Sequence, residues 1–322
     1  MLIDYKRDNY LSEFSHKTLQ DRYLIAGETS PQDAFARAAR AFSDNDAHAQ
    51  RLYDYASKLW FMFSTPILSN GGTARGLPIS CFLNYIEDSR TGLTGHYTEN
   101  AFLSSVGGGV GGSWSDVRSV GSKTSNGSES TGVIPFMKVV DAEMLAFSQG
   151  VTRRGSYAAY LDISHPEIEE FLDVRKPTGG DINRKSVNLH HGVVISDKFM
   201  ELIEQATREP GFDDSWDLID PHTKQVIKTV SAKTLWVKLI QNRVETGEPY
   251  IMFGDTVNAA LPQFQKDMGL SVHHSNLCSE ITLPTNEGRT AVCCLSSVNL
   301  EEFDEWKYNK DFIPDLIRML DN

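Results

Sequence analysis

The chain has 322 residues, 40% of them hydrophobic and 23% charged, which is the composition of an ordinary soluble globular protein. Its formal net charge of −12 argues against binding to nucleic acid through the phosphate backbone, because an acidic surface repels phosphates. There is no apolar stretch of the roughly 20 residues that span a bilayer, no secretory signal pattern, and only four cysteines, too few for a disulfide scaffold. We therefore expect a cytoplasmic protein without a membrane or nucleic-acid partner.

Helices alternate with short apolar strands along the chain, and this alternation favours an α/β fold with a largely parallel sheet. Ser30-Pro31 and Asp88-Ser89 are typical of helix starts, and Ser164 to Glu167 has the spacing of a capping box. The expected helices cover residues 31–42, 47–63, 89–106, 134–147, 164–174, 197–206, 232–246 and, from 311, the last residues. The expected strands cover residues 77–86, 157–161, 187–195 and 250–253.

A glycine run, residues 107–112, lies between the strand expected at 77–86 and a long polar loop. Such a run can bring backbone N–H groups close to a phosphate, but no Gly-Lys-Ser/Thr ends it, and a close-packed turn is the simpler interpretation. Arg118, Arg153 and Arg154 lie in or beside loops, near the helix start at Asp88-Ser89. Together these groups would suit an effector nucleotide, with the carboxylate on a ribose hydroxyl and the arginines on phosphates.

The most informative segment is Asn276-Leu277-Cys278-Ser279-Glu280. In an extended strand, residues two apart share a face, so we expect Asn276, Cys278 and Glu280 to point at one small ligand. A carboxylate disfavours a neighbouring thiolate electrostatically. The environment therefore favours a cysteine that reacts as a neutral thiol or a radical over a nucleophilic one.

Zinc binding and acyl transfer are two alternatives for the same region. His273-His274, Cys278 and Cys293-Cys294 lack the close Cys or His pairs of structural zinc sites, so no metal site is expected. A nucleophilic cysteine needs an imidazole beside its thiol, whereas the alternating neighbours here are an amide and a carboxylate. His190-His191 lie in an expected strand and are expected to pack or to face solvent.

Six segments, in this order and spacing, resemble the large (catalytic) subunit of ribonucleotide reductase. They are Ser64-Thr65-Pro66-Ile67; Ile79-Ser80-Cys81-Phe82-Leu83 with Asp88-Ser89; Gly107-Gly108-Gly109-Val110-Gly111; Phe147-Ser148-Gln149-Gly150 with Arg153; Ser275-Asn276-Leu277-Cys278-Ser279-Glu280-Ile281; and Ala291-Val292-Cys293 with Leu295-Ser296-Ser297. The resemblance runs across nearly the whole sequence. It implies a ten-stranded α/β barrel, of which this chain carries the first half-barrel, the finger loop near 278 and the start of the second half.

The resemblance also implies a role for each catalytic residue. Cys278 would become a transient thiyl radical that abstracts the ribose 3′ hydrogen, and Glu280 would take the 3′-hydroxyl proton as general base. Asn276 would hold the ribose hydroxyls. Cys81 would help to expel the 2′-hydroxyl as water and would then form a disulfide with Cys293, the two-electron donor pair.

Substrate and effector residues follow from the same resemblance. Thr65, Ser80 and the backbone near Gly109 would line the substrate pocket. Five further residues would bind the specificity effector, a deoxynucleoside triphosphate or ATP, or carry its identity to the substrate base: Asp88, Ser89, Arg118, Gln149 and Arg153. The segment 149–155 would be that communicating loop.

The expected organisation is an N-terminal helical region, residues 1–70, without the family's ATP cone, followed by a partial catalytic barrel, residues 71–322. The chain is expected to bind no cofactor itself and to receive its radical from a metal-containing small subunit. The other expected partners are a ribonucleoside diphosphate substrate, a second copy of the chain, a complementary C-terminal fragment, and thioredoxin or glutaredoxin as reductant. Alone, the chain is expected to be inactive and poorly soluble. The alternatives are an adenosylcobalamin-dependent reductase and an inactive nucleotide-binding fragment.

Overall fold

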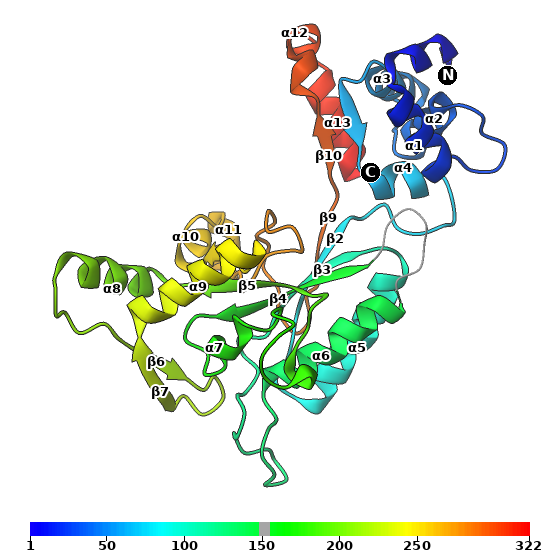
Figure 1. The fold of residues 1–322 in the computed structure, drawn as a ribbon. Helices are drawn as coiled ribbons and strands as arrows, with labels where there is room; N and C mark the ends of the chain where they lie inside the picture. The colour runs from blue at the N-terminus through cyan, green and yellow to red at the C-terminus, as the bar shows by residue number, and fades with distance from the viewer. Residues whose placement is uncertain (148–154) are drawn as a thin grey trace. The chain divides into compact units, whose positions relative to one another are not determined.

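The computed structural model describes residues 1–147 and 155–322, and the chain divides into two compact units (Figure 1). The helical unit comprises residues 1–80 and 292–322, and the sheet unit comprises residues 81–147 and 155–291. None of the helices in these two ranges combines the length and apolarity that crossing a bilayer needs.

The helical unit is built from short helices and one two-stranded sheet. Its elements are η1 (Tyr5–Tyr10), α1 (Glu13–Arg22), α2 (Pro31–Ala41), α3 (Asp46–Ser57), β1 (Phe61–Phe63), α4 (Thr65–Asn70), β10 (Ser296–Val298), η3 (Leu300–Glu302), α12 (Phe303–Trp306) and α13 (Phe312–Asp321). The expected start of α2 is confirmed: Ser30 Oγ accepts a hydrogen bond from Gln32 N, and the Asp33 carboxylate accepts one from Ser30 N. This capping box satisfies backbone donors at the helix N-terminus.

The helix expected over 47–63 is wrong in its last turn and a half. α3 ends at Ser57, and Leu59 takes a left-handed conformation with φ of 61°. The apolar run that follows forms β1, which pairs antiparallel with β10, Phe61 opposite Val298. Since its partner strand lies more than 230 residues away, the local pattern could not show that this run is a strand.

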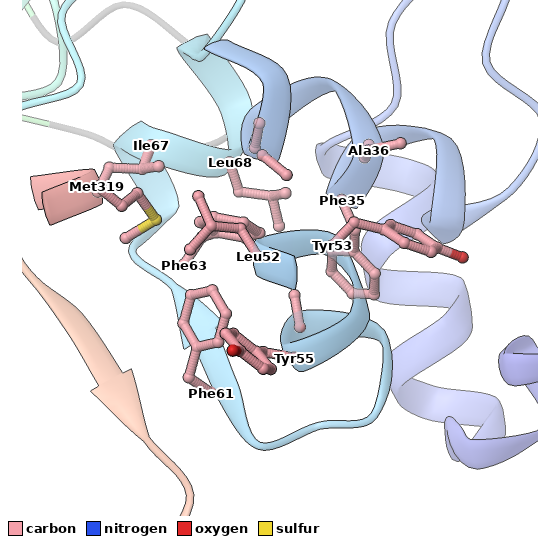
Figure 2. Close-up of a cluster of buried hydrophobic side chains, with 14 of the residues drawn as sticks. Phe35, Ala36, Leu52, Tyr53, Tyr55, Phe61, Phe63, Ile67, Leu68 and Met319 are labelled. Carbon is pink, nitrogen blue, oxygen red and sulfur yellow. The ribbon is translucent and has the colours of Figure 1, made fainter. Parts of the chain in front are cut away.

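One apolar core holds the helical unit together. Aromatic and aliphatic side chains from α2, α3, β1 and α4 meet the apolar side of α13; the labelled ones in Figure 2 are Phe35, Ala36, Leu52, Tyr53, Tyr55, Phe61, Phe63, Ile67, Leu68 and Met319. Burying each large side chain contributes about 1.5–3 kcal/mol. Arg51 forms a bidentate ion pair with Asp315 of α13, its Nε and Nη2 lying 2.7 and 2.8 Å from the two carboxylate oxygens. The C-terminal helix is therefore an integral part of this core.

The sheet unit is a parallel sheet with helical connections. Its elements are β2 (Cys81–Tyr85), α5 (Arg90–Ser105), β3 (Gly109–Ser113), α6 (Val133–Ala146), β4 (Ser156–Asp162), α7 (Ile168–Phe171), η2 (Ile182–Arg184), β5 (His190–Ile195), α8 (Asp197–Arg208), β6 (Ser215–Ile219), β7 (Val226–Ser231), α9 (Ala232–Thr246), β8 (Tyr250–Phe253), α10 (Gly254–Ala259) and α11 (Gln263–Asp267). The strand order is β8-β5-β4-β3-β2, every neighbour parallel, and β6 with β7 forms a separate hairpin. β9 (Ala291–Cys293), which starts at the last residue of this unit, follows β2 in the strand order.

The register of the sheet decides which residues share a face. One row runs across β2, β3, β4, β5 and β8: Tyr85, Ser113, Tyr160, Gly192 and Tyr250. Residues in register on neighbouring strands point to the same side of a sheet, and residues two apart along a strand do as well. Cys81 and Gly111 therefore lie on the same face as this row.

Most expected elements of this unit are confirmed, including α5, α6, α8, α9, β4, β5 and β8. The glycine run was expected to be a turn, and that is wrong: residues 109–113 form the fully buried strand β3. The capping box expected at Ser164 to Glu167 is also absent. The Glu167 carboxylate instead accepts hydrogen bonds from Val120 N and Val133 N, at 3.1 and 3.0 Å, and α7 is shorter than expected.

Candidate active site

The segment around Cys278 is a turn, which we call the finger turn (residues 276–279). Ser279 N donates to the carbonyl oxygen of Asn276 at 3.3 Å, and Ser279 has a φ of 67°. The expected extended strand is therefore wrong, and the three residues do not share a face. Asn276 is buried, whereas Cys278 and Glu280 are exposed close to one another in sequence.

The side chain of Asn276 holds the finger turn from inside. Its Oδ1 accepts hydrogen bonds from Glu280 N at 3.0 Å, Ile281 N at 3.1 Å and Ser275 Oγ at 3.2 Å. Its Nδ2 is buried and has no hydrogen-bond partner within residues 1–147 and 155–322. Because an unsatisfied buried donor is costly, this amide is a ready donor to a bound ligand.

Gly111 of β3 lets the chain approach the sheet just before the finger turn. A Cβ atom at Gly111 would lie 2.1 Å from the Ser275 carbonyl oxygen and 2.8 Å from the Asn276 Cα atom. Nearby, His274 Nε2 lies 3.0 Å from the Gly111 carbonyl oxygen. Burial, with a smaller contribution from the charge of His273, lowers the pKa of His274 to about 3, so the ring is neutral at pH 7 and donates from Nε2. The glycine run thus leaves space for the backbone of Ser275 and Asn276.

Tyr160 of β4 makes the other contact to the finger turn. Its hydroxyl donates to the Asn276 carbonyl oxygen at 2.8 Å, and its ring is fully buried. Sequence reasoning missed Tyr160, and it considered His274 only as a candidate zinc ligand. Strand alternation could have assigned Tyr160 to a face, but its acceptor lies 116 residues further along the chain.

The cysteines of the expected disulfide lie in different units. Cys81 is buried in β2 of the sheet unit, and Cys293 is buried in β9, in the part of it that belongs to the helical unit. Their pairing stays a prediction. Cys294 is half-buried, burial raises the pKa of its thiol, and its Sγ lies 3.8 Å from the Pro78 carbonyl oxygen.

The expected substrate residues are likewise divided between the units. Thr65 is the first residue of α4, and its hydroxyl lies 3.0 Å from the Tyr23 hydroxyl. Ser80 is buried, and its Oγ has no hydrogen-bond partner within the described part of the chain. Gly109 opens β3, in register with Cys81. Their common pocket stays a prediction.

The structure brings three of the expected effector residues together. Arg118 Nε lies 2.9 Å from Asp88 Oδ2, and the guanidinium also donates to the Lys123 carbonyl oxygen at 2.8 Å. Ser89 caps α5, its Oγ accepting from Gly92 N at 2.9 Å. The N-terminus of that helix therefore lies beside the Asp88–Arg118 ion pair, and the binding of an effector there stays a prediction. Gln149 and Arg153 lie outside the described residues.

Asp220 fixes the loop that follows Arg118, and sequence reasoning missed it. This fully buried carboxylate accepts hydrogen bonds from Ser119 N at 2.9 Å, Ser119 Oγ at 2.7 Å and Ser122 Oγ at 2.5 Å. Burial alone would raise the pKa of Asp220, but these hydrogen bonds outweigh it and hold the pKa well below its usual range. The loop is therefore tied to an ionised group inside the sheet unit.

The adjacent histidines of β5, His190 and His191, pack against Glu248, which is one of the two expected outcomes. His190 Nδ1 and His191 Nδ1 lie 2.5 and 3.0 Å from the two carboxylate oxygens of Glu248, which Arg175 also contacts at 2.6 Å. Among the residues that the structure describes, no group of three or more His, Cys, Asp or Glu side chains could hold a metal ion.

Comparisons with known proteins agree on one family. The family described as ribonucleotide reductase, barrel domain, matches residues 79–322, and the all-alpha domain of the same enzyme matches residues 10–76. The chain is 45% identical over 368 residues to a ribonucleoside-diphosphate reductase large subunit of Invertebrate iridescent virus 3, covering 99% of this chain and 57% of that protein. It is 52% identical over 274 residues to a putative large subunit of Frog virus 3, covering 85% and 46%.

A solved structure gives the same result. The alpha subunit of a class Id ribonucleotide reductase from Actinobacillus ureae superposes with a TM-score of 0.80 at 34% identity, covering 100% of this chain and 54% of that one. The expected fold class, an α/β barrel of the ribonucleotide reductase type, is confirmed. The chain spans about half the length of that structure and of the first viral relative. It belongs to the ribonucleotide reductase large-subunit family.

Proposed function

We propose that this chain is the catalytic part of a ribonucleoside-diphosphate reductase, which makes deoxyribonucleotides by a cysteine thiyl mechanism. The observation that carries the proposal is the finger turn. The turn exposes the Cys278 thiol, and the carboxylate of Glu280, directly after the turn, is exposed as well. The turn also contains the buried Asn276 amide, whose Nδ2 has no partner in the described part of the chain. A substrate with vicinal hydroxyls matches these three groups.

The proposed chemistry gives each group one task. The Cys278 radical takes the 3′ hydrogen atom while Glu280 accepts the 3′-hydroxyl proton and Asn276 donates to a ribose hydroxyl. Cys81 protonates the 2′-hydroxyl, which leaves as water. Cys81 and Cys293 then supply two electrons as they form a disulfide, and Cys278 returns the hydrogen atom to C3′. One ribonucleotide and two thiols therefore give one deoxyribonucleotide, one disulfide and one water.

The names of the relatives support the partners. They are called large subunit or subunit alpha, names that imply a second subunit, and we propose that a metal-containing small subunit supplies the radical. This favours the subunit-dependent class over an adenosylcobalamin-dependent reductase. A deoxynucleoside triphosphate or ATP would bind at Asp88, Ser89 and Arg118, with Gln149 and Arg153 completing the site. The thioredoxin or glutaredoxin that renews the cysteines is part of the same proposal.

Reconstitution tests the proposal. The chain is combined with the proposed complementary C-terminal segment and with a radical-generating small subunit, and reduction of cytidine diphosphate is measured. Cys278→Ala is expected to abolish reduction. Cys294→Ala is the control, because Cys294 is adjacent to Cys293 but is not part of the proposed redox pair, and this variant is expected to retain reduction. Reduction that persists in Cys278→Ala would contradict the proposed role. A chain that binds deoxynucleoside triphosphates and never reduces substrate would instead be the nucleotide-binding fragment.

A further inference from the structure

The side chain of Tyr160 links the finger turn to the sheet. This residue lies in β4 in the row that also contains Ser113, Gly192 and Tyr250 on the neighbouring strands. Its side chain is fully buried, and its hydroxyl donates to the Asn276 carbonyl oxygen at 2.8 Å. A hydrogen bond thus links β4, an inner strand of the sheet, to the turn that carries Cys278.

The absence of a side chain at Gly192 fixes the direction of the Tyr160 ring. A Cβ atom at Gly192 would lie 2.5 Å from Cε1 and 2.7 Å from Cδ1 of that ring. The ring therefore occupies the space that any larger residue at 192 would fill. Because its rotation is restricted by this packing, the hydroxyl is a preorganised donor.

The acceptor of this bond also closes the finger turn. The same Asn276 carbonyl oxygen accepts from Ser279 N, and Ser279 has the left-handed φ of 67°. Non-glycine residues adopt that conformation at a cost, and they keep it only where surrounding contacts impose it. The hydrogen bond from the Tyr160 hydroxyl to the Asn276 carbonyl oxygen is such a contact. Cys278 lies between Asn276 and Ser279, the two ends of the turn.

We propose that Tyr160 is a positioning residue, which fixes the location of the Cys278 thiol through its hydrogen bond to the Asn276 carbonyl. The inference rests on the proposed function for its catalytic consequence, whereas the holding of the turn is a property of the folded chain alone. Abstraction of a hydrogen atom needs the reacting atoms about 3–3.5 Å apart, and a misplacement of about 1 Å costs about 100-fold in rate. Burial raises the pKa of Tyr160 well above its usual value, so the hydroxyl remains a donor at neutral pH.

The test compares two tyrosines of the same strand in the reconstituted enzyme. Tyr160→Phe keeps the ring and removes only the hydroxyl. Tyr157→Phe is the matched control, because the Tyr157 hydroxyl is also buried but bonds His96 and Trp114, at 3.0 and 3.1 Å. Two quantities are measured: kcat and KM for nucleotide reduction, and the rate at which iodoacetamide alkylates Cys278, read by mass spectrometry with Cys294 as internal reference.

Tyr160→Phe is expected to lower kcat by about 10- to 100-fold with little change in KM. It is also expected to change the alkylation rate of Cys278 by roughly fivefold, the factor that one lost neutral hydrogen bond is worth. Tyr157→Phe should leave both quantities at the wild-type level. Gly192→Ala, which displaces the ring but keeps the hydroxyl, should reproduce the effect of Tyr160→Phe, and the double variant should add nothing further.

The two readouts separate this proposal from the proposed function. A changed alkylation rate in Tyr160→Phe and Gly192→Ala supports the holding role even in preparations that reduce no nucleotide, a result that would count against the reductase. If Tyr160→Phe matches the wild type in both kcat and alkylation rate, or if Tyr157→Phe changes them equally, Tyr160 does not position the thiol.

Discussion

The amide of Asn276 presents two different groups to its surroundings. Its Oδ1 accepts hydrogen bonds from the backbone N–H groups of Glu280 and Ile281, whereas its Nδ2 is buried without a partner in the part of the chain that the structure describes. The substitution Asn276→Asp keeps the Oδ1 acceptor and replaces the Nδ2 donor with a second acceptor oxygen. The substitution therefore separates the structural task of this residue from its proposed task toward substrate.

We predict that Asn276→Asp retains the finger turn but slows nucleotide reduction. The backbone donors stabilise a carboxylate as well as an amide, while the substrate hydroxyl loses a donor, which costs about 1–3 kcal/mol and therefore about 5- to 150-fold in kcat/KM. Reductase kinetics and the alkylation rate of Cys278 measure the two effects separately. Asn276→Ala, which removes both groups, should change both. Wild-type kinetics in Asn276→Asp would show that the orphaned donor does not contact substrate.

The chemistry-bearing residues could be identified from the sequence, but their arrangement could not. The residue types around Cys278 and their match to the reductase motifs led to the family that the comparisons establish. The inference that alternating positions share a face failed, because Ser279 adopts a left-handed backbone conformation that closes a turn. Such a conformation in a non-glycine residue is imposed by distant contacts, here from β3 and β4, which the local sequence does not encode.

At the scale of elements, the packing of β3 against the segment before the finger turn requires a glycine at position 111. The Ser275 carbonyl oxygen passes so close to Gly111 that an added Cβ would lie 2.1 Å from it. We predict that Gly111→Ala destabilises the chain by about 1–3 kcal/mol, because one of two backbone segments must shift. Urea denaturation measures the loss.

Gly95 provides the matched control for this substitution. It lies exposed in α5, and a Cβ there would meet no atom within 4 Å. Since alanine is the better helix former, Gly95→Ala should raise the free energy of unfolding by about 0.5–1 kcal/mol. Equal effects of the two substitutions would mean that the finger segment does not rest on β3.

The segment before the finger turn makes stability depend on pH. The pKa of His274 is lowered to about 3 in the folded state by burial and by the charge of His273, against about 6.5 in an unfolded chain. As the pH falls below about 6.5, the unfolded state binds the proton and the folded state does not, so the free energy of unfolding falls. Between pH 7.5 and pH 5 this one residue should cost about 2 kcal/mol.

His274→Gln isolates that contribution, because glutamine retains an N–H donor for the Gly111 carbonyl but does not titrate. Urea denaturation of both proteins at the two pH values should show a pH-dependent loss that is about 2 kcal/mol smaller in the variant. His96 and His165 are also buried with lowered pKa values, about 3 and about 4, so the variant should keep part of the dependence. Identical losses in the two proteins would contradict the assignment to His274.

Elements that depend on local pattern could be predicted, and those that depend on distant pairing could not. Caps and amphipathic periodicity located α2, α5, α8 and α9 to within a few residues. β1 was missed since its partner strand, β10, lies at the other end of the chain. The hairpin β6–β7 was missed although its strands contain strand-forming residues such as Trp216, Val226 and Ile227, and most of its side chains are exposed.

For the whole molecule, the outer surface of the sheet unit bears on the expected homodimer. α5 and α6 lie side by side (Figure 1). Large apolar side chains on them, and directly after α6, are exposed: Phe102 of α5 at 71%, Val139 and Leu145 of α6 at 47% and 60%, and Phe147 at 45%. Exposed apolar side chains gathered on neighbouring helices are typical of interaction surfaces. We therefore place the expected contact between two copies of the chain on these two helices.

We predict that Phe102→Glu weakens self-association of the chain by about 30-fold or more, because a central aromatic residue of an interface contributes about 2 kcal/mol or more. Sedimentation equilibrium over a range of concentrations measures the dissociation constant. Val244→Glu is the control: this residue is 83% exposed, on α9, and a charge there adds the same net repulsion without touching α5 or α6. If both variants weaken association equally, net charge is responsible. If neither does, the two copies meet elsewhere, and the apolar side chains of α5 and α6 face a different partner.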